Sequence, residues 1–195
     1  VTRVQTCALP ISPAEDHFGI PQVRYINEQV AAAWADAGIE PAAPATDGEW
    51  CRRLHLDLIG RIPAIDEVER FVADKASDKR RALVDRLLGD DFVDEYARHS
   101  TDVWTTILIG RDVANERVNR SGMRQYLRRA FSKNKPYDQF MEELVTATGA
   151  NANRESVDRF NGATNFLAGK LEEMGVENAV QATAKTAQIF LGLQV

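Results

Sequence analysis

The chain has 195 residues, of which 44% are hydrophobic and 27% are charged, and its formal net charge is −5 at pH 7. This length is enough for one domain with a sizeable core, and the acidic balance argues against a protein devoted to nucleic acid. No apolar run approaches the roughly 18 residues that a membrane-spanning helix needs, so this stretch of chain is not expected to be transmembrane.

The first twelve residues, VTRVQTCALPIS, have no initiator Met, and their apolar run is too short for the core of a signal peptide. Read back into codons, they match a common sequencing-library adapter apart from Arg3, which differs by one base. We therefore expect residues 1–12 to be adapter translation, with a genuine N-terminal tail as the alternative. Setting them aside leaves Cys51 as the sole cysteine, so the sequence predicts no internal disulfide and no thiolate metal site.

Beyond residue 12, apolar residues recur at helical spacing almost everywhere, and no alternating run is flanked by hairpin turns. This pattern predicts an all-α fold: an irregular array of about eight or nine helices with no significant sheet. The expected helices span residues 23–37, 46–60, 64–74, 79–89, 92–109, 121–133, 136–146 and 165–171, with a last one from about residue 177.

Local signals mark where several of these helices start. Thr46 with Glu49 three residues on has the form of a capping box, Ser121 is the expected cap of the sixth helix, and Pro136 is expected to start the seventh. The expected apolar stripes are Tyr25, Ile26, Val30 and Trp34 in the first helix, Ile65, Val68 and Phe71 or Val72 in the third, and Phe92, Val93, Tyr96, Ala97, Val103, Trp104, Ile107 and Leu108 in the fifth.

Residues 13–195 are expected to form a single helical domain that is truncated at both ends. A Pro/Ala linker is predicted at about residues 38–46 and a polar surface loop at about 149–162. The last helix is still apolar in FLGLQV, and neither a cap nor a polar tail follows in the sequence. We interpret this as a pattern that continues past Val195 in the natural protein.

The three histidines, His17, His55 and His99, are far apart in sequence and form no metal-binding pair. His55 lies on the flank of an apolar stripe, which favours a hydrogen-bonded core imidazole. Neighbours on a helix point about 100° apart, so the run ARHSTD does not predict a Ser-His-Asp triad. His99 and Asp102, three residues apart, are compatible with a surface ion pair or with an oriented base.

Residues 111–135 carry eight basic side chains against two acidic ones, a net charge of +6 in an acidic chain. Nucleic acid is not an expected partner, because the nearby aromatics Tyr126 and Phe131 fall on the apolar face of the helix. Two interpretations stay open: a site for an anionic polymer, or docking against an acidic partner domain or the chain's own acidic residues 13–74. The candidate anion-binding or docking residues are Arg117, Arg120, Arg124, Arg128, Arg129 and Lys133.

The segment RRLHLDLIGRIPAIDEVERFVAD, residues 52–74, carries a resemblance to a known family. It closely resembles the planctomycete cytochrome-associated domain of unknown function numbered fifteen-forty-nine, whose pattern runs RR-x-YLDL-x-G-x-x-P-x-x-x-E-V-x-x-F-x-x-D. The resemblance continues through LVDRLL, VWTTILIGR, NKPYDQF, LVTATG and FLGLQV, from about Tyr25 to Val195. Departures are His55 where Tyr is usual, Ala64 where Thr often follows the Pro, and Tyr96 where Trp is common.

The resemblance implies a context in which relatives are large multi-domain bacterial proteins, often exported or membrane-associated. In many of them the FLGxQ segment runs into a C-x-x-C-H motif that attaches haem or binds metal. The expected cofactor is thus a c-type haem held downstream of Val195, and the expected partners are the neighbouring domains of the same polypeptide. Membrane association is expected only through segments outside this chain, and a periplasmic or other extracytoplasmic location is implied for the whole protein.

From these expectations we predict that the chain is a non-catalytic helical module that packs beside a haem-bearing segment. This stretch of chain is itself expected to hold no cofactor and no metal. Two alternatives remain from other functional classes. One is part of an enzyme that acts on carbohydrate polymers, for which the sequence indicates no catalytic residue. The other is a module that binds an anionic polymer through residues 111–135.

Overall fold

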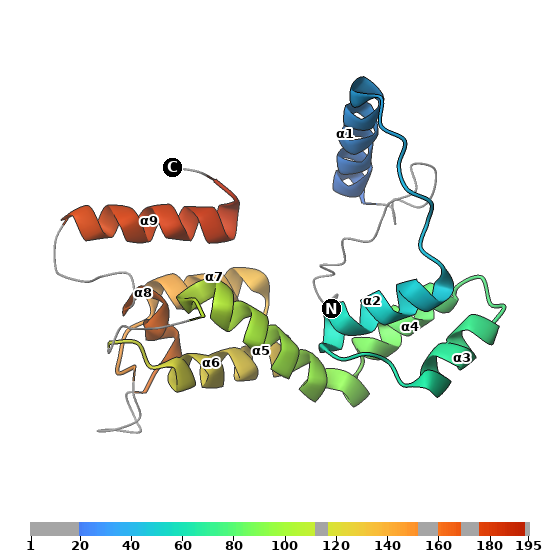
Figure 1. Ribbon diagram of the computed structural model, residues 1–195. Helices are drawn as coiled ribbons and strands as arrows, with labels where there is room; N and C mark the ends of the chain where they lie inside the picture. The colour runs from blue at the N-terminus through green and yellow to red at the C-terminus, as the bar shows by residue number, and fades with distance from the viewer. Residues whose placement is uncertain (1–19, 112–116, 152–159, 169–175, 194–195) are drawn as a thin grey trace. The chain divides into compact units, whose positions relative to one another are not determined.

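The computed structural model describes residues 20–111, 117–151, 160–168 and 176–193 (Figure 1). Over these ranges the fold is all-α, as the hydrophobic periodicity predicts, and the only strand-like feature is an isolated bridge between Ala150 and Phe160. The expected adapter segment 1–12 and His17 lie outside the described residues. The helices are α1 (Pro21–Ala37), α2 (Asp47–Ile59), α3 (Ile65–Ala73), α4 (Lys79–Leu87), α5 (Val93–Ile109), α6 (Arg120–Ser132), α7 (Tyr137–Thr146), α8 (Asn165–Ala168) and α9 (Val176–Leu191), with 3-10 turns η1 (Asp90–Phe92) and η3 (Gly162–Thr164).

The chain divides into two compact units, each of which is described by itself. The first consists of residues 1–57 and 62–79, and the second of residues 58–61 and 80–195. The expectation that residues 13–195 form a single domain therefore stays a prediction.

In the first unit, the predicted capping box opens α2. Oγ1 of Thr46 accepts from the Glu49 backbone N–H over 3.4 Å, and Oε2 of Glu49 accepts from the Thr46 backbone N–H over 3.0 Å. One turn on, the Trp50 ring stacks on Phe71 of α3, with centroids 5.5 Å apart and planes 15° apart. Nζ of Lys79 lies 5.1 Å from the centroid of Phe71. The two reciprocal cap bonds thus determine where α2 begins. The aromatic stack then holds α2 against α3.

Two of the expected apolar stripes are not covered as the periodicity suggests. In α3 only Phe71 is buried, while Ile65 is 79% exposed and Val72 is 45% exposed. In α1, Tyr25 and Ile26 are 62% and 53% exposed. The expected burial of Ile65 is wrong, and of the alternatives Phe71 and Val72 it is Phe71 that is buried. Periodicity identifies the apolar face of a helix but not whether a neighbour covers all of it.

The core of the second unit forms where α5, α6, α7, α8 and α9 meet. Phe190 of α9 contacts Phe166 of α8, with ring centroids 5.5 Å apart, and Trp104 of α5 meets Phe140 of α7 edge to face at 5.3 Å. The buried residues of this core are Leu108, Met123, Leu127, Ala130, Phe140, Leu144, Ala163, Phe166 and Phe190. Burial of this aliphatic and aromatic surface is the main force that holds the unit together.

The inner face of α5 differs from the expected stripe. Val103 and Ile107 are 42% and 46% exposed, whereas Thr101 and Thr105 are buried. The Thr105 hydroxyl donates to the Thr101 carbonyl oxygen over 2.5 Å, so this polar group is hydrogen-bonded within the helix itself. Thr105 can therefore occupy the buried face, and the expectation for Val103 and Ile107 is wrong.

The cap of α6 lies two residues earlier than expected. Oδ1 of Asn119, not the Ser121 hydroxyl, accepts from the Gly122 backbone N–H over 2.9 Å. Both Asn and Ser are good N-cap residues, so local preference does not separate them. Asn119 is selected because its own backbone N–H is held by a distant residue, Asn165.

The C-terminal end of the last helix carries both buried and exposed apolar side chains. Phe190 is buried, but Leu191 and Leu193 are 63% and 52% exposed. Gly192, at φ 66°, follows the helix in the left-handed region, so α9 ends on a glycine stop that the sequence interpretation did not recognise. Among the described helices, none combines the length and the apolar character needed to cross a membrane.

Candidate functional site

A row of charged side chains follows the seam between α5 and α6 in the second unit. Nη1 of Arg124 lies 2.5 Å from Oδ1 of Asp102, and Nη2 of Arg128 lies 3.4 Å from Oδ1 of Asp94. The Arg120 guanidinium continues the row by donating to the Gly110 carbonyl oxygen over 2.8 Å. Residue numbers rise along α5 as they fall along α6, so the two helices are antiparallel, and each arginine meets an acceptor on α5.

This row accounts for much of the basic stretch. Arg120 also donates to the Arg111 carbonyl, so its positive charge lies at the C-terminal end of α5, where the helix dipole favours a cation. The acidic partners of Arg124 and Arg128 come from α5, in the same unit. Docking of this stretch against the acidic residues 13–74 stays a prediction.

The six candidate patch residues therefore separate into groups. Arg120, Arg124 and Arg128 contact α5 or the turn that follows it, and Arg117 lies before α6, where its carbonyl oxygen accepts from the Asn151 side chain. Arg129 near the end of α6 and Lys133 directly after it are exposed, and they make no ion pair within the described part of the chain. Binding of an anion by this surface stays a prediction.

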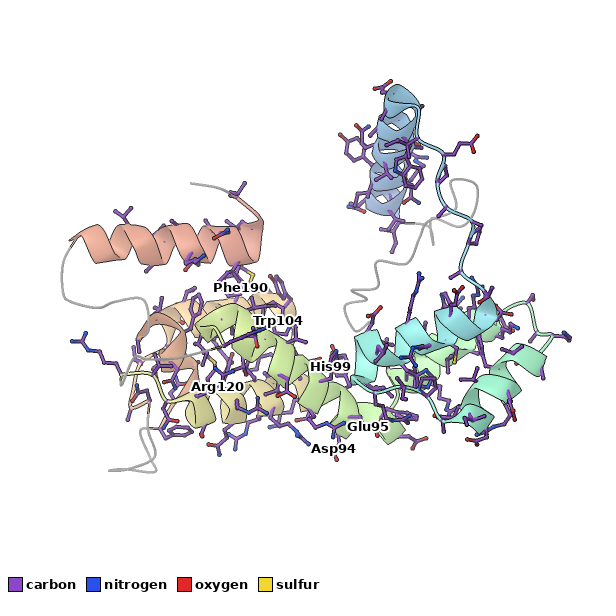
Figure 2. All side chains as sticks on the ribbon, in the orientation of Figure 1. Asp94, Glu95, His99, Trp104, Arg120 and Phe190 are labelled. Carbon is purple, nitrogen blue, oxygen red and sulfur yellow. The ribbon has the colours of Figure 1, made fainter. Side chains whose placement is uncertain are left out.

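A second polar cluster lies where the end of α2 meets α5 (Figure 2). Nε of Arg61 lies 3.3 Å from both carboxylate oxygens of Glu95, and its guanidinium carbon lies 5.9 Å from the centroid of Phe92. One helical turn along α5 from Glu95, the His99 ring lies against Gly60. An ideal Cβ on Gly60 would be 2.4 Å from Nδ1 of His99, and its φ of 69° already favours glycine.

His99 and Asp102 thus take separate roles. Asp102 pairs with Arg124, and His99 packs over the glycine turn that ends α2. The structure does not bring His99 and Asp102 together as an oriented base, and the pairing that the sequence left open is not formed.

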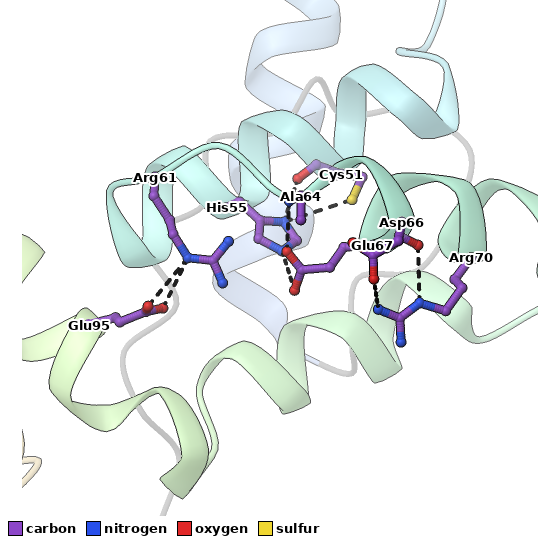
Figure 3. Close-up of polar contacts among 8 residues, drawn as sticks. All are labelled: Cys51, His55, Arg61, Ala64, Asp66, Glu67, Arg70 and Glu95. Atoms are coloured by element: carbon purple, nitrogen blue, oxygen red, sulfur yellow. Dashed lines mark hydrogen bonds and ion pairs between the residues drawn. The ribbon is translucent and has the colours of Figure 1, made fainter.

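His55 is the buried core imidazole that its place on the apolar stripe predicts. It is 1% exposed, and its Nδ1 lies 2.9 Å from the Cys51 carbonyl oxygen. On the other side of the ring, Nε2 lies 3.9 Å from Oε1 of Glu67 in α3 (Figure 3). This contact between α2 and α3 was not predicted from the sequence. The sequence shows only that Cys51 and His55 are four residues apart on one helix.

A third cluster joins α6 and α7 through Glu143. The Tyr126 hydroxyl donates to Oε2 of Glu143 over 3.0 Å, and the Lys135 ammonium pairs with the same carboxylate while lying 5.4 Å from the centre of the Tyr126 ring. Burial and then the nearby Glu143 charge raise the pKa of the Tyr126 hydroxyl well above its ordinary value. Both effects disfavour the phenolate, so Tyr126 is a hydrogen-bond donor here.

Asparagines organise the opposite end of α6. Oδ1 of Asn165 accepts from the Asn119 backbone N–H over 2.6 Å, and its Nδ2 donates to the carbonyl oxygens of Gly162 and Asn151 over 2.9 and 3.3 Å. Asn165 is fully buried. The predicted loop 149–162 contributes backbone carbonyl oxygens to this network, and the sequence does not indicate which carbonyls a distant amide will reach.

The described residues do not fit a c-type haem. Covalent attachment uses two thiols in a C-x-x-C pair and an adjacent histidine. Cys51 is fully buried in α2, and its Sγ lies 3.8 Å from Nδ1 of His55, a group four residues away on the same helix. In the described ranges, no three or more His, Cys, Asp and Glu side chains form a group able to hold a metal ion.

Comparison of the sequence with known protein families gives a match that covers the residues that form these contacts. The model of the family described as PSCyt2, a protein of unknown function (DUF1549), matches residues 25–195. No curated protein and no solved structure matches the chain. The matched range contains the helices that build the three polar clusters, α2 to α7, together with α8 and α9. The chain belongs to the PSCyt2 family of unknown function (DUF1549).

Proposed function

We propose that this chain is a non-catalytic helical module of a larger, exported bacterial protein, in which it packs beside a segment that carries a c-type haem. The observation that carries the proposal is that charged side chains pair between helices and turns. Asp102, Glu95 and Glu143 each pair with a cation from another helix or turn, rather than converging on a common point. Side chains used in this way hold helices in place.

The apolar surface of α9 supports the docking part of the proposal. Leu191 and Leu193 are more than half exposed next to the buried Phe190, whose ring packs on Phe166. Exposed apolar side chains that adjoin a packed core are typical of surfaces that another domain covers. The haem segment is the proposed occupant because the resemblance places such a segment directly after FLGLQV.

The test uses the natural protein that contains this chain with its neighbouring segments, produced with c-type haem maturation. We expect a haem absorption band in the wild type. We also expect Leu191→Glu with Leu193→Glu to weaken docking, measured as faster proteolysis between the module and the haem segment. Val180→Glu, at a site on α9 that is 63% exposed, is the matched control and should leave the proteolysis rate unchanged.

A correctly matured protein without a haem band would overturn the proposal. The same preparation separates the alternatives. An anionic-polymer module would bind a sulfated polysaccharide with an affinity that falls steeply with salt, and Arg128→Glu with Arg129→Glu would abolish that binding. A carbohydrate-directed enzyme would hydrolyse a glycan, and substitution of one carboxylate would remove the activity.

A further inference from the structure

The buried imidazole of His55 lies between a backbone carbonyl and a carboxylate. Nδ1 is 2.9 Å from the Cys51 carbonyl oxygen on α2, and Nε2 is 3.9 Å from Oε1 of Glu67 on α3. The Glu67 side chain is only 11% exposed. Its other oxygen, Oε2, accepts from the Ala64 backbone N–H over 2.8 Å, so the carboxylate is held in place at the first turn of α3.

This geometry determines where the protons lie. A carbonyl oxygen can only accept a hydrogen bond, so Nδ1 of His55 carries a hydrogen. If the ring is neutral, Nε2 then presents a lone pair to the Glu67 carboxylate, which is electrostatically unfavourable. If the ring is protonated, Nε2 carries a hydrogen and faces the carboxylate with the opposite charge. The arrangement is complementary to the protonated ring, although burial alone disfavours a charge.

Among the described residues, the titratable side chains with contacts to this ring lie on α2 and α3. On α2, Sγ of Cys51 lies 3.8 Å from Nδ1, and on α3 the Glu67 carboxylate faces Nε2 (Figure 3). We propose that the His55 ring is protonated on both nitrogens at neutral pH and forms an ion pair with Glu67, and that this charge makes the attachment of the first turn of α3 to α2 sensitive to pH. The stabilisation is present while the pair keeps the proton and is lost as rising pH removes it.

The test is an NMR titration of the histidine rings in the full chain, with the His55 signals assigned by a His55→Gln variant. In the wild type at pH 7, the ¹⁵N shifts of the His55 ring are expected to show hydrogens on both nitrogens. In Glu67→Gln, the His55 titration midpoint is expected to fall by about one pH unit or more, because the opposite charge is removed. Glutamine can still accept from the Ala64 N–H, so the cap of α3 is kept.

Glu69→Gln is the matched control, because it removes the same charge from an exposed site on the same helix and should leave the midpoint unchanged. Three results would overturn the proposal. The first is a bare Nε2 in the wild type at pH 7, which requires no variant to detect. The second is an unchanged midpoint in Glu67→Gln. The third is a midpoint that moves with Cys51→Ala but not with Glu67→Gln, which would assign the proton to an imidazolium–thiolate pair.

Discussion

The Asn119 backbone N–H at the start of α6 donates to Oδ1 of Asn165 in α8 over 2.6 Å, and the two residues are 46 positions apart. The same Asn119 caps α6 with its side chain. One buried amide thus determines where α6 begins and where the segment that contains α8 returns to it.

Asn165→Ala should therefore be among the more destabilising single substitutions in the second unit. It leaves the buried N–H of Asn119 and the Gly162 carbonyl without their partner, a loss of about 2–3 kcal/mol in the free energy of unfolding. Urea unfolding followed by circular dichroism measures it. Asn119→Ala, which removes only the cap bond from the side chain, should cost about 1 kcal/mol. Equal costs for the two variants would contradict the central role of Asn165.

Gly162→Ala tests the close approach of η3 to α6. An ideal Cβ at this position would lie 2.1 Å from the Gly122 carbonyl oxygen, a backbone atom that cannot move alone. We expect a loss of about 1–3 kcal/mol, as for overpacked cores. Gly48→Ala is the control, because its Cβ would meet only Val68, at 4.0 Å, inside a helix where alanine is preferred. Thermal melts should show a lower midpoint for the first variant and an unchanged or higher one for the second.

The ion pair between Arg124 and Asp102 should show measurable coupling. Both side chains are about half exposed, so solvent screening limits the pair to about 0.5 kcal/mol. A double-mutant cycle of Arg124→Gln and Asp102→Asn in low salt would measure this coupling. The coupling should decrease in 1 M salt, because the Debye length there is roughly 3 Å. Arg128 and Asp94, at 3.4 Å with Asp94 86% exposed, should couple less. A stronger coupling for the second pair would contradict the geometry.

The Tyr126 hydroxyl should lose its proton at a higher pH than an ordinary tyrosine. Burial first, and then the Glu143 charge, raise the pKa of its hydroxyl in the folded state. The unfolded chain therefore loses this proton first, and the contribution of Tyr126 to stability is complete below about pH 10 and declines as pH rises above it. Absorbance titration of the phenolates should show a late component that Tyr126→Phe removes.

The polar clusters show how far local sequence goes toward the candidate site. The capping box of Thr46 and Glu49 needs only residues three positions apart, and it formed as predicted. His55 was correctly expected in the core because its burial follows from its place on the apolar stripe. Its contact with Glu67 was not foreseen, because it depends on the angle at which α3 returns past α2 after Pro63.

By itself, the sequence determined the all-α class, the approximate helix boundaries and the apolar side of most helices, because helical periodicity and capping act over a few residues. Only the tertiary structure decided which acidic groups meet the arginines of α6 and which apolar side chains remain exposed on α1, α3 and α9. Those outcomes depend on contacts between residues distant along the chain. A charge or a methyl group on one helix carries no information about which face of another will lie against it.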